Sequence, residues 1–214
     1  MDFYKFIKDI GEALKKPLPG KDTQLKMSSM RRIRELMDGY QWETSIRSSV
    51  LILLYPDIDE KNISTVLIQR PNYEGVHGGQ ISLPGGRSED SDKDLMETAL
   101  REAKEEIGIQ PDKVVILGNL TELYIPPSNY LVSPFIGYTV QKPQFYPDLQ
   151  EVDRIIEIHL SDLLNDDNIK HKEIYVRPGL TVSGPCFEIN GFTIWGATAM
   201  ILNEFREILM RMRI

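Results

Sequence analysis

Hydrophobic and polar positions follow two different periods along this chain, one typical of helices and one typical of strands. Helical spacing appears first near the start, in one apolar stripe made of Phe3, Phe6, Ile7, Ile10 and Leu14. The stripe ends before Pro17, Pro19 and Gly20, which do not continue a helix. Helical patterns return at 28–38 and at 196–212, where good helix formers carry apolar residues. The pattern predicts a helix in each of these three places.

Strand patterns occupy the middle of the chain. Eight short runs are dense in β-branched and aromatic residues and are bounded by turn residues, as buried strands are. These runs lie at 48–56, 64–70, 114–120, 121–125, 133–140, 154–160, 173–177 and 192–196. They predict a mixed α/β domain, which we place at residues 41–214, after an N-terminal helical extension at 1–40. We expect the apolar stripe of the extension to pack on the domain or to form a homodimer contact, in preference to a membrane surface.

Composition and charge narrow the class of protein. The chain has 214 residues and a formal net charge of −7, whereas a general nucleic-acid-binding protein needs a basic face to contact phosphates. No apolar run reaches the roughly 18 residues that span a bilayer, and the first ten residues do not resemble a signal peptide. The single cysteine, Cys186, has no partner for an internal disulfide and is interpreted as a packing residue. These features predict a cytoplasmic protein that binds neither nucleic acid nor membrane.

The segment from 92 to 107 predicts an acidic helix of about four turns. Ser91 is placed to cap its start, with Asp94 three residues on in a capping-box arrangement. Gly108 is placed to end the helix in the left-handed conformation. At 100° per residue, one arc of the helix faces the core. This arc contains Met96, Ala99, Leu100, Ala103 and Ile107.

Three glutamates, Glu102, Glu105 and Glu106, occupy the adjoining arc of the same helix. Their spacing makes them repel one another, and the C-terminal end of a helix disfavours negative charge. A solvated acidic face is the ordinary interpretation of such a set, although Arg101 is adjacent and able to pair with one member. A bound cation removes the repulsion, and oxygen ligands suit Mg²⁺ or Mn²⁺. We therefore favour a metal-binding helix.

A glycine loop, LPGG at residues 83–86, precedes this helix. Gly85 and Gly86 allow the backbone to approach a ligand closely, or to present a carbonyl oxygen to a metal ion. Paired glycines commonly mark only a turn. Next to a metal-binding helix, however, this loop is interpreted as a cradle for a diphosphate group.

The run REAKEEIGI, from Arg101 to Ile109, resembles the second half of the Nudix box. The first half matches when one extra residue is allowed, with Gly86 as the glycine and Asp92 as the acid. This longer acidic loop, together with VLIQRPNYEGVHGGQISLPGG at 66–86, resembles the coenzyme A pyrophosphatase branch of the Nudix hydrolases. Gly75 stands where that branch usually has an arginine, and Leu83 replaces its phenylalanine. The likeness runs from about residue 47 to residue 205.

The resemblance implies a Nudix α/β/α sandwich with a mixed β-sheet, and hydrolysis of a nucleoside diphosphate linked to another moiety. It implies coenzyme A as the substrate, cleaved to adenosine 3′,5′-bisphosphate and 4′-phosphopantetheine. Because of Gly75, ADP-ribose, NADH and diadenosine polyphosphates stay open as substrates. A Nudix-fold module that senses a nucleotide without cleaving it is a lesser alternative, because such a module is expected to lose the acidic set.

The resemblance also implies roles for individual residues. Glu102, Glu105 and Glu106 match metal-binding or catalytic-base positions, with a Mg²⁺ or Mn²⁺ cofactor and Gly86 beside it. Glu151 is the candidate for a further catalytic carboxylate, with Asp153 in reserve, and Arg101 is expected to orient a glutamate. The candidate substrate contacts are Arg70, His77, Gln80, Gly85 and Arg87, each with a structural role as the alternative. Tyr124 and Tyr130 are expected either to border the substrate pocket or to pack in the core.

Overall fold

The computed structural model describes the chain except for residues 1, 38–43, 59–61, 72–77, 178 and 213–214. Its α-helices are α1 (Phe3–Leu14), α2 (Lys21–Leu25), α3 (Met30–Met37), α4 (Leu95–Ile107), α5 (Leu160–Leu164) and α6 (Gly196–Arg211). Its strands are β1 (Ile46–Pro56), β2 (Ile63–Gln69), β3 (Ile81–Ser82), β4 (Gly85–Arg87), β5 (Val115–Asn119), β6 (Leu123–Ile125), β7 (Tyr130–Tyr138), β8 (Arg154–His159), β9 (Ile169–Arg177), β10 (Leu180–Ile189) and β11 (Phe192–Ile194). Single 3₁₀ turns are η2 (Pro111–Lys113), η3 (Pro126–Ser128) and η4 (Asp166–Asn168).

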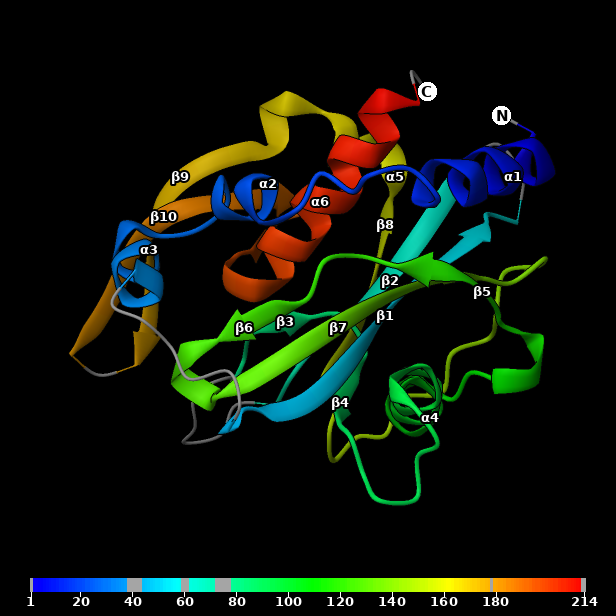
Figure 1. The fold of residues 1–214 in the computed structure, drawn as a ribbon, viewed down its shortest axis with the longest axis horizontal. Coiled ribbons are helices and arrows are strands. Elements are labelled where there is room, and N and C mark those ends of the chain that lie inside the picture. The colour runs from blue at the N-terminus through cyan, green and yellow to red at the C-terminus, as the bar shows by residue number, and fades with distance from the viewer. Residues whose placement is uncertain (1, 38–43, 59–61, 72–77, 178, 213–214) are drawn as a thin grey trace.

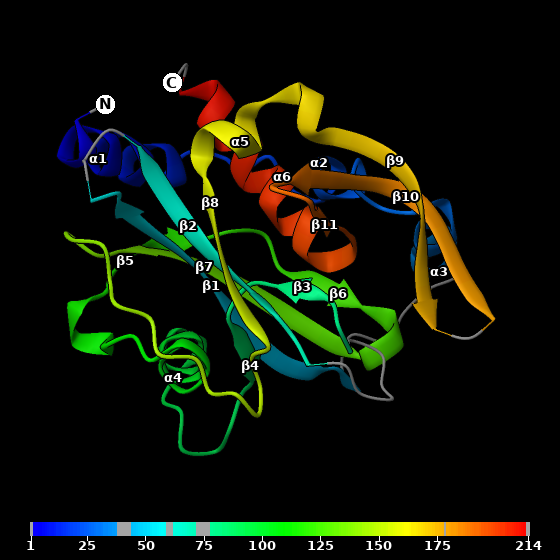
Figure 2. The same ribbon diagram turned by 180° about the vertical axis from the view of Figure 1, so that it is seen from behind.

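A mixed sheet forms the centre of the molecule. Its main path runs β3-β2-β1-β7-β5, while β4 pairs with β1, β6 with β7 and β8 with β2. Strands β1 and β7 are parallel and the other pairs are antiparallel. A second, antiparallel sheet has the order β11-β10-β9 and lies beside α3 and α6 (Figure 2). The predicted mixed α/β fold is confirmed.

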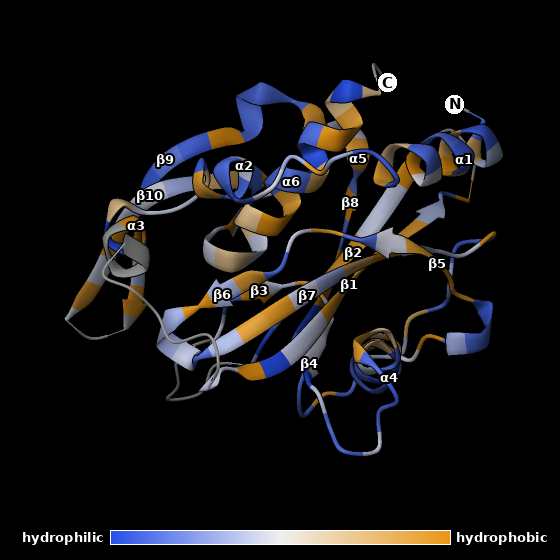
Figure 3. Ribbon diagram, in the orientation of Figure 1, coloured by the Kyte–Doolittle hydropathy of each residue, from blue (hydrophilic) through white to orange (hydrophobic). Residues whose placement is uncertain are grey.

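Helices cover both faces of the central sheet, with α4 on one side and α1, α2 and α6 on the other (Figure 1). The alternation of β1 explains this layering, because neighbouring side chains of a strand point to opposite faces. Leu51, Leu53 and Tyr55 pack in the cluster that contains Ala103 of α4. The intervening residues, such as Ile52, pack in the cluster on the opposite face. Figure 3 shows the hydrophobic side of α4 turned toward the sheet.

The N-terminal helices pack on the domain. Phe3, Phe6, Ile7 and Ile10 of α1 are buried in the same cluster as the sheet residues that face α6. The buried carboxylate of Glu204 in α6 then fixes the following segment: Gln24 Nε2 donates to it at 2.8 Å and the Gly20 amide at 3.1 Å. The packing interpretation of the apolar stripe is thereby confirmed, whereas the homodimer contact and the boundary at 40/41 stay predictions. None of the described helices is long and apolar enough to cross a membrane.

Helix α4 corrects part of the sequence prediction. Its N-cap is Asp94, which accepts from the Glu97 amide at 2.8 Å, so the helix begins at Leu95 and Ser91 does not cap it. Met96, predicted to face the core, is 38% exposed. The C-terminal prediction is confirmed, because Gly108 has φ 73° and its amide donates to the Lys104 carbonyl at 2.9 Å.

Candidate active site

The glycine loop is held against the central strand by β4. Gly85 lies opposite Val50 of β1 and Gly86 opposite Ser49. Gly85 has φ +148°, and a Cβ there would come within 2.2 Å of the Ser49 carbonyl oxygen. Only glycine fits this position. The sequence predicts that Gly85 lets the backbone approach a ligand or a metal ion, whereas in the structure the backbone at Gly85 approaches strand β1.

Glu106 lies directly behind this loop. Its side chain is 1% exposed, and it accepts from the Gly85 amide at 2.8 Å and from Arg70 Nη2 at 3.2 Å. Burial raises the pKa of the Glu106 carboxyl to about 7, against the lowering effect of Arg70 and the Gly85 amide. The negative charges of Glu102 and Glu151 add to that rise. The site therefore holds a carboxylate whose charge is only partly compensated by protein groups.

Glu102 lies one turn earlier on α4 and beside the second glycine. A Cβ on Gly86 would come within 2.5 Å of the Glu102 carboxyl carbon, so Gly86 leaves room for this side chain. Burial raises the pKa of the Glu102 carboxyl, the charges of Glu105 and Glu151 raise it further, and Arg101 opposes them. The negative charge of Glu151 thus raises the pKa values of both Glu102 and Glu106, so the three carboxylates lie close enough to repel one another.

Arg101 binds four acceptors around this group. Its Nε and Nη2 donate to the Asp92 carboxylate at 2.8 and 3.0 Å, and Nη2 also donates to the Arg87 carbonyl at 2.9 Å. Its Nη1 donates to Glu102 at 2.9 Å and to Glu105 at 3.0 Å. Arg101 therefore fixes the acidic loop to the helix and orients two of the predicted metal ligands.

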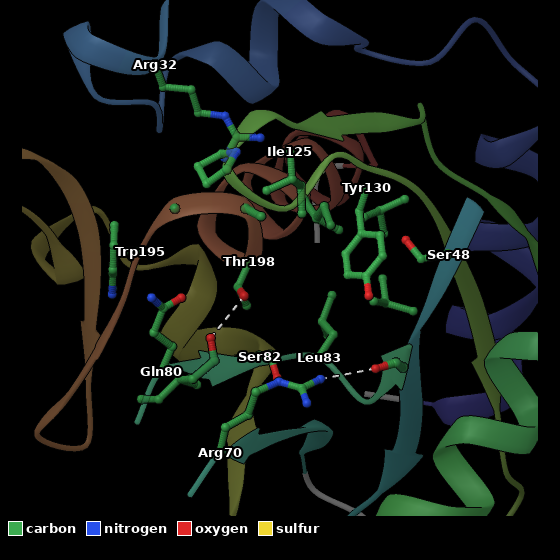
Figure 4. Close-up of a pocket in the computed structure, with 18 of the residues that line it drawn as sticks. Arg32, Ser48, Arg70, Gln80, Ser82, Leu83, Ile125, Tyr130, Trp195 and Thr198 are labelled. Carbon is green, nitrogen blue, oxygen red and sulfur yellow. Dashed lines mark hydrogen bonds between the residues drawn. The ribbon is translucent and has the colours of Figure 1, made fainter. Parts of the chain in front are cut away.

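A cavity of about 770 Å³ opens in front of these groups. Its polar part is lined by Ser48, Ser49, Arg70, Gln80, Ser82, Gly85, Gly86, Arg87, Glu102, Glu106 and Glu151. Its apolar part is lined by Met27, Ile125, Pro126, Pro127, Tyr130, Val132, Ile174, Val176, Leu180, Val182, Trp195 and Ile201. Figure 4 shows Arg70 and Gln80 at one side of the cavity and Arg32 at the opposite side.

Most of the predicted site residues thus line one cavity. Glu105 and Arg101 are not among the lining residues, and the Glu105 side chain is 55% exposed. His77 lies outside the described residues. Of the two tyrosines, Tyr130 lines the cavity, whereas Tyr124 is buried and its hydroxyl donates to Asn129 Oδ1 at 2.8 Å. Asp153, the reserve for Glu151, is not a lining residue either.

The donor set fits a hard divalent cation. Glu102, Glu106 and Glu151 supply carboxylate oxygens on one cavity wall, and burial together with mutual repulsion raises the pKa values of Glu102 and Glu106. Within the described residues, no three side chains are already grouped closely enough to enclose an ion. Arg101 donates to one carboxylate oxygen of Glu102 and to one of Glu105, so these contacts use only one oxygen of each carboxylate.

Comparison with known proteins identifies the family. The model of the NUDIX domain matches residues 46–175. The chain belongs to the Nudix family. It is 32% identical over 164 residues to the protein named "Uncharacterized Nudix hydrolase NudL" from Yersinia pestis (strain Pestoides F), covering 77% of this chain and 80% of that one. A NudL from Yersinia pseudotuberculosis serotype O:1b matches to the same extent. The chain is therefore a Nudix hydrolase, which acts on a diphosphate substrate, and this family typically uses divalent metal ions.

Solved Nudix structures confirm the fold. The Nudix hydrolase RenU from M. smegmatis aligns with a TM-score of 0.55 at 14% identity, over 78% of this chain and 87% of that one. A C. elegans Ap4A hydrolase binary complex aligns with a TM-score of 0.51 at 15% identity, over 78% and 98%. The mixed α/β Nudix fold of this chain is thus preceded by N-terminal helices.

Sequence analysis missed much of the lining of the cavity in this Nudix hydrolase. The missed residues come from the segment before α3 and the first turn of α3, from η3, from β9 and β10, and from the start of α6. Trp195 and Thr198 fall in the runs predicted only as a strand at 192–196 and a helix at 196–212, although the Thr198 hydroxyl donates to the Ile81 carbonyl at 3.0 Å and so ties α6 to β3. No local pattern marks these residues, because they meet only through the tertiary fold.

Proposed function

We propose that this Nudix hydrolase cleaves the diphosphate bond of coenzyme A or its derivatives, giving adenosine 3′,5′-bisphosphate and 4′-phosphopantetheine. The observation that carries the proposal is the segment HGGQISLPGG at 77–86, which resembles the coenzyme A pyrophosphatase signature and is followed by the longer acidic loop. The shape of the cavity supports it. The polar lining residues near the glutamates suit a diphosphate, and the many apolar lining residues suit a long, mostly uncharged arm.

The residues have separate proposed roles. Glu102, Glu106 and Glu151 would hold Mg²⁺ or Mn²⁺, with Glu105 and the Gly86 carbonyl as further ligands. When bound, the ion neutralises the diphosphate and acidifies a water molecule. Arg70 and Arg87 lie on the cavity wall where they can contact phosphate oxygens. A carboxylate of the set accepts the proton of the attacking water as the bond between phosphorus and the leaving oxygen breaks.

Arg101 acts in this proposal by positioning other groups. Its guanidinium holds Glu102 and Asp92 together at 2.8 to 3.0 Å and lies outside the cavity lining. Gln80 and Gly85 line the polar part of the cavity, and His77 belongs to the same sequence signature.

The net charge of −7 does not prevent binding of a polyanion once the cation is in place. For the location of the protein we propose the cytoplasm, since a chain with one cysteine suits a reducing compartment.

A direct test is to incubate the purified protein with coenzyme A and Mg²⁺ or Mn²⁺ and to identify products by mass spectrometry. We expect equal amounts of phosphopantetheine and adenosine bisphosphate, and neither product in EDTA. If no phosphopantetheine forms at micromolar enzyme while ADP-ribose, NADH or a diadenosine polyphosphate is cleaved, the alternative substrate class replaces coenzyme A. Gly75, in place of the usual arginine, is the feature that favours this alternative.

A further inference from the structure

One wall of the cavity comes from a part of the chain that precedes the matched domain. Met27, Ser28, Ser29, Arg31 and Arg32 line the cavity, whereas the NUDIX match begins at residue 46. Met27 and Ser28 are buried, with 3% and 7% exposure. The N-terminal extension therefore contributes to the cavity in addition to the core.

The β9–β10 hairpin lines the cavity next to this N-terminal segment, and the part of the cavity between the two is called the chamber below. Ile174, Val176, Leu180 and Val182 supply branched aliphatic side chains to the lining. The two walls meet at Gly184, where a Cβ would lie 3.3 Å from the Cβ of Ser29. The absence of a side chain at this position allows β10 and the start of α3 to close the chamber between them.

The N-terminal wall is fixed to the rest of the protein at two places. Arg32 Nη2 donates to the Tyr124 carbonyl at 2.7 Å. Earlier in the segment, Asn203 Nδ2 donates to the Thr23 carbonyl at 2.7 Å, and Gln24 binds Glu204. Since these bonds lie on both sides of residues 27–29, the wall has a defined place and can discriminate between ligands by shape.

We propose that residues 27–32 and the β9–β10 hairpin select the part of the substrate beyond the diphosphate, and that this part is an aliphatic chain with amide groups. The inference rests on the proposed function. The side chains that β9 and β10 contribute to the lining are apolar and not aromatic, whereas the aromatic lining residues, Tyr130 and Trp195, lie in β7 and at the N-cap of α6. Aliphatic side chains suit an aliphatic chain better than a planar base, which is recognised by stacking on aromatic faces. The Ser82 hydroxyl of β3, a buried atom without a hydrogen-bond partner among the described residues, belongs to the polar part of the same cavity and is available for a polar contact with an amide.

The test uses the two product halves as competitive inhibitors. In the full-length protein, Ser28→Leu places a larger apolar side chain in the N-terminal wall. We expect its inhibition constant for 4′-phosphopantetheine to rise at least about tenfold. Its constant for adenosine 3′,5′-bisphosphate should stay unchanged, because the nucleoside half lies outside the chamber. The assay substrate is coenzyme A with Mn²⁺, or ADP-ribose if coenzyme A is not hydrolysed.

Two further variants complete the design. Lys26→Leu is the matched control, since Lys26 is an exposed residue of the same segment that does not line the cavity, and both inhibition constants should match the wild type. Val182→Phe narrows the chamber from the β9–β10 hairpin, at a half-buried position, and should repeat the effect of Ser28→Leu if that variant folds poorly. Melting curves show which variants are folded.

The outcomes separate this inference from the proposed function. If only ADP-ribose is hydrolysed, the proposed function is wrong, yet selective weakening of phosphopantetheine still supports the chamber. If folded Ser28→Leu and Val182→Phe weaken both halves equally, weaken only the bisphosphate, or weaken neither, the chamber proposal is wrong. The same holds if wild-type protein hydrolyses coenzyme A but is not inhibited by phosphopantetheine.

Discussion

Among single residues, the carboxylates of the site matter most to the proposed catalysis, because neighbouring protein groups compensate their negative charge only in part. Glu106 shows this most clearly, because it is buried and has one arginine and one amide as partners. Burial alone disfavours its charge, and two neighbouring carboxylates add to the effect. A cation bound at these carboxylates would supply the missing positive charge.

Replacing Glu106 tests this point. Glu106→Gln keeps the shape of the side chain and removes its charge, so the rate of coenzyme A hydrolysis should fall about 10²-fold or more while folding is retained. The measurement is kcat and KM with saturating Mn²⁺, together with a melting curve. Glu97→Gln is the control, since Glu97 lies on the same helix but not in the cavity. An unchanged rate in Glu106→Gln would remove this residue from the metal site.

Asp92 gives a prediction for the dependence of stability on pH. Arg101 holds the pKa of the Asp92 carboxyl well below its ordinary value of 3.8. A lowered pKa means that the carboxylate stabilises the fold above pH 4, and that this stabilisation is lost as the pH falls below that value. Asp92→Asn should therefore lower the free energy of unfolding by about 1–3 kcal/mol at pH 7, with a smaller difference near pH 3. Urea denaturation at both pH values measures this, and an equal loss at both would contradict it.

The carboxylates were predictable from the sequence, because Glu102 and Glu106 lie four residues apart on one helix and need only local periodicity to be found. The cap of that helix was not. Ser91, Asp92 and Asp94 are all capable N-caps, and the choice depends on Arg101, which binds Asp92 and leaves Asp94 to cap.

At the scale of elements, the short strand β4 positions the site, and its two glycines serve different contacts. Gly85 lies against backbone atoms of β1, whereas Gly86 lies against the end of the Glu102 side chain. Backbone atoms of a central strand move at high cost, while a carboxylate can rotate away. The two positions should therefore respond differently to the same substitution.

Gly85→Ala should destabilise the protein by about 3 kcal/mol or more, since its Cβ meets the Ser49 carbonyl at 2.2 Å and φ is +148°. Gly86→Ala should leave the melting temperature nearly unchanged but lower kcat, because the new methyl displaces the Glu102 carboxylate. Thermal melts and kinetics of both variants check this. A stable, active Gly85→Ala protein would show that the loop is not held against β1 as described.

Strand β10 shows where sequence patterns stop being informative. Gly184 and Pro185 interrupt its apolar alternation and are typical of a turn. In the fold, Gly184 is a strand residue that approaches Ser29 from more than 150 residues earlier in the chain. The lining residues from 27–32 and from β9 and β10 were missed for the same reason, because these segments are distant in the sequence and have no common motif.

At the scale of the whole molecule, the N-terminal extension and the Nudix domain share one core. Phe6 and Ile10 of α1 pack in the cluster that contains Phe205 of α6. Glu204, next to Phe205, accepts from Gly20, Gln24 and Thr121. The C-terminal helix α6 therefore holds the N-terminal segment at residues 20–24 in place.

Replacing Glu204 tests this anchor. In Glu204→Gln, the new amide group faces donors instead of accepting from them, so stability should fall by about 1–3 kcal/mol. Amide hydrogen exchange should become faster at residues 20–29, while the exchange of α4 stays unchanged. Glu207→Gln is the control, because Glu207 is on the same helix and pairs only with Arg211 in the described contacts. Unchanged protection of the segment would contradict the anchoring role.

The proposed diphosphate hydrolysis requires Glu102, Glu105 and Glu106, with Glu151, to bind divalent ions. Titration calorimetry of the wild type and of Glu106→Gln with Mn²⁺, in the presence of a nucleotide diphosphate, tests it most directly. We expect saturable Mn²⁺ binding to the wild type and at least about tenfold weaker binding to the variant. Equal binding to both proteins, or no binding to the wild type, would contradict the account.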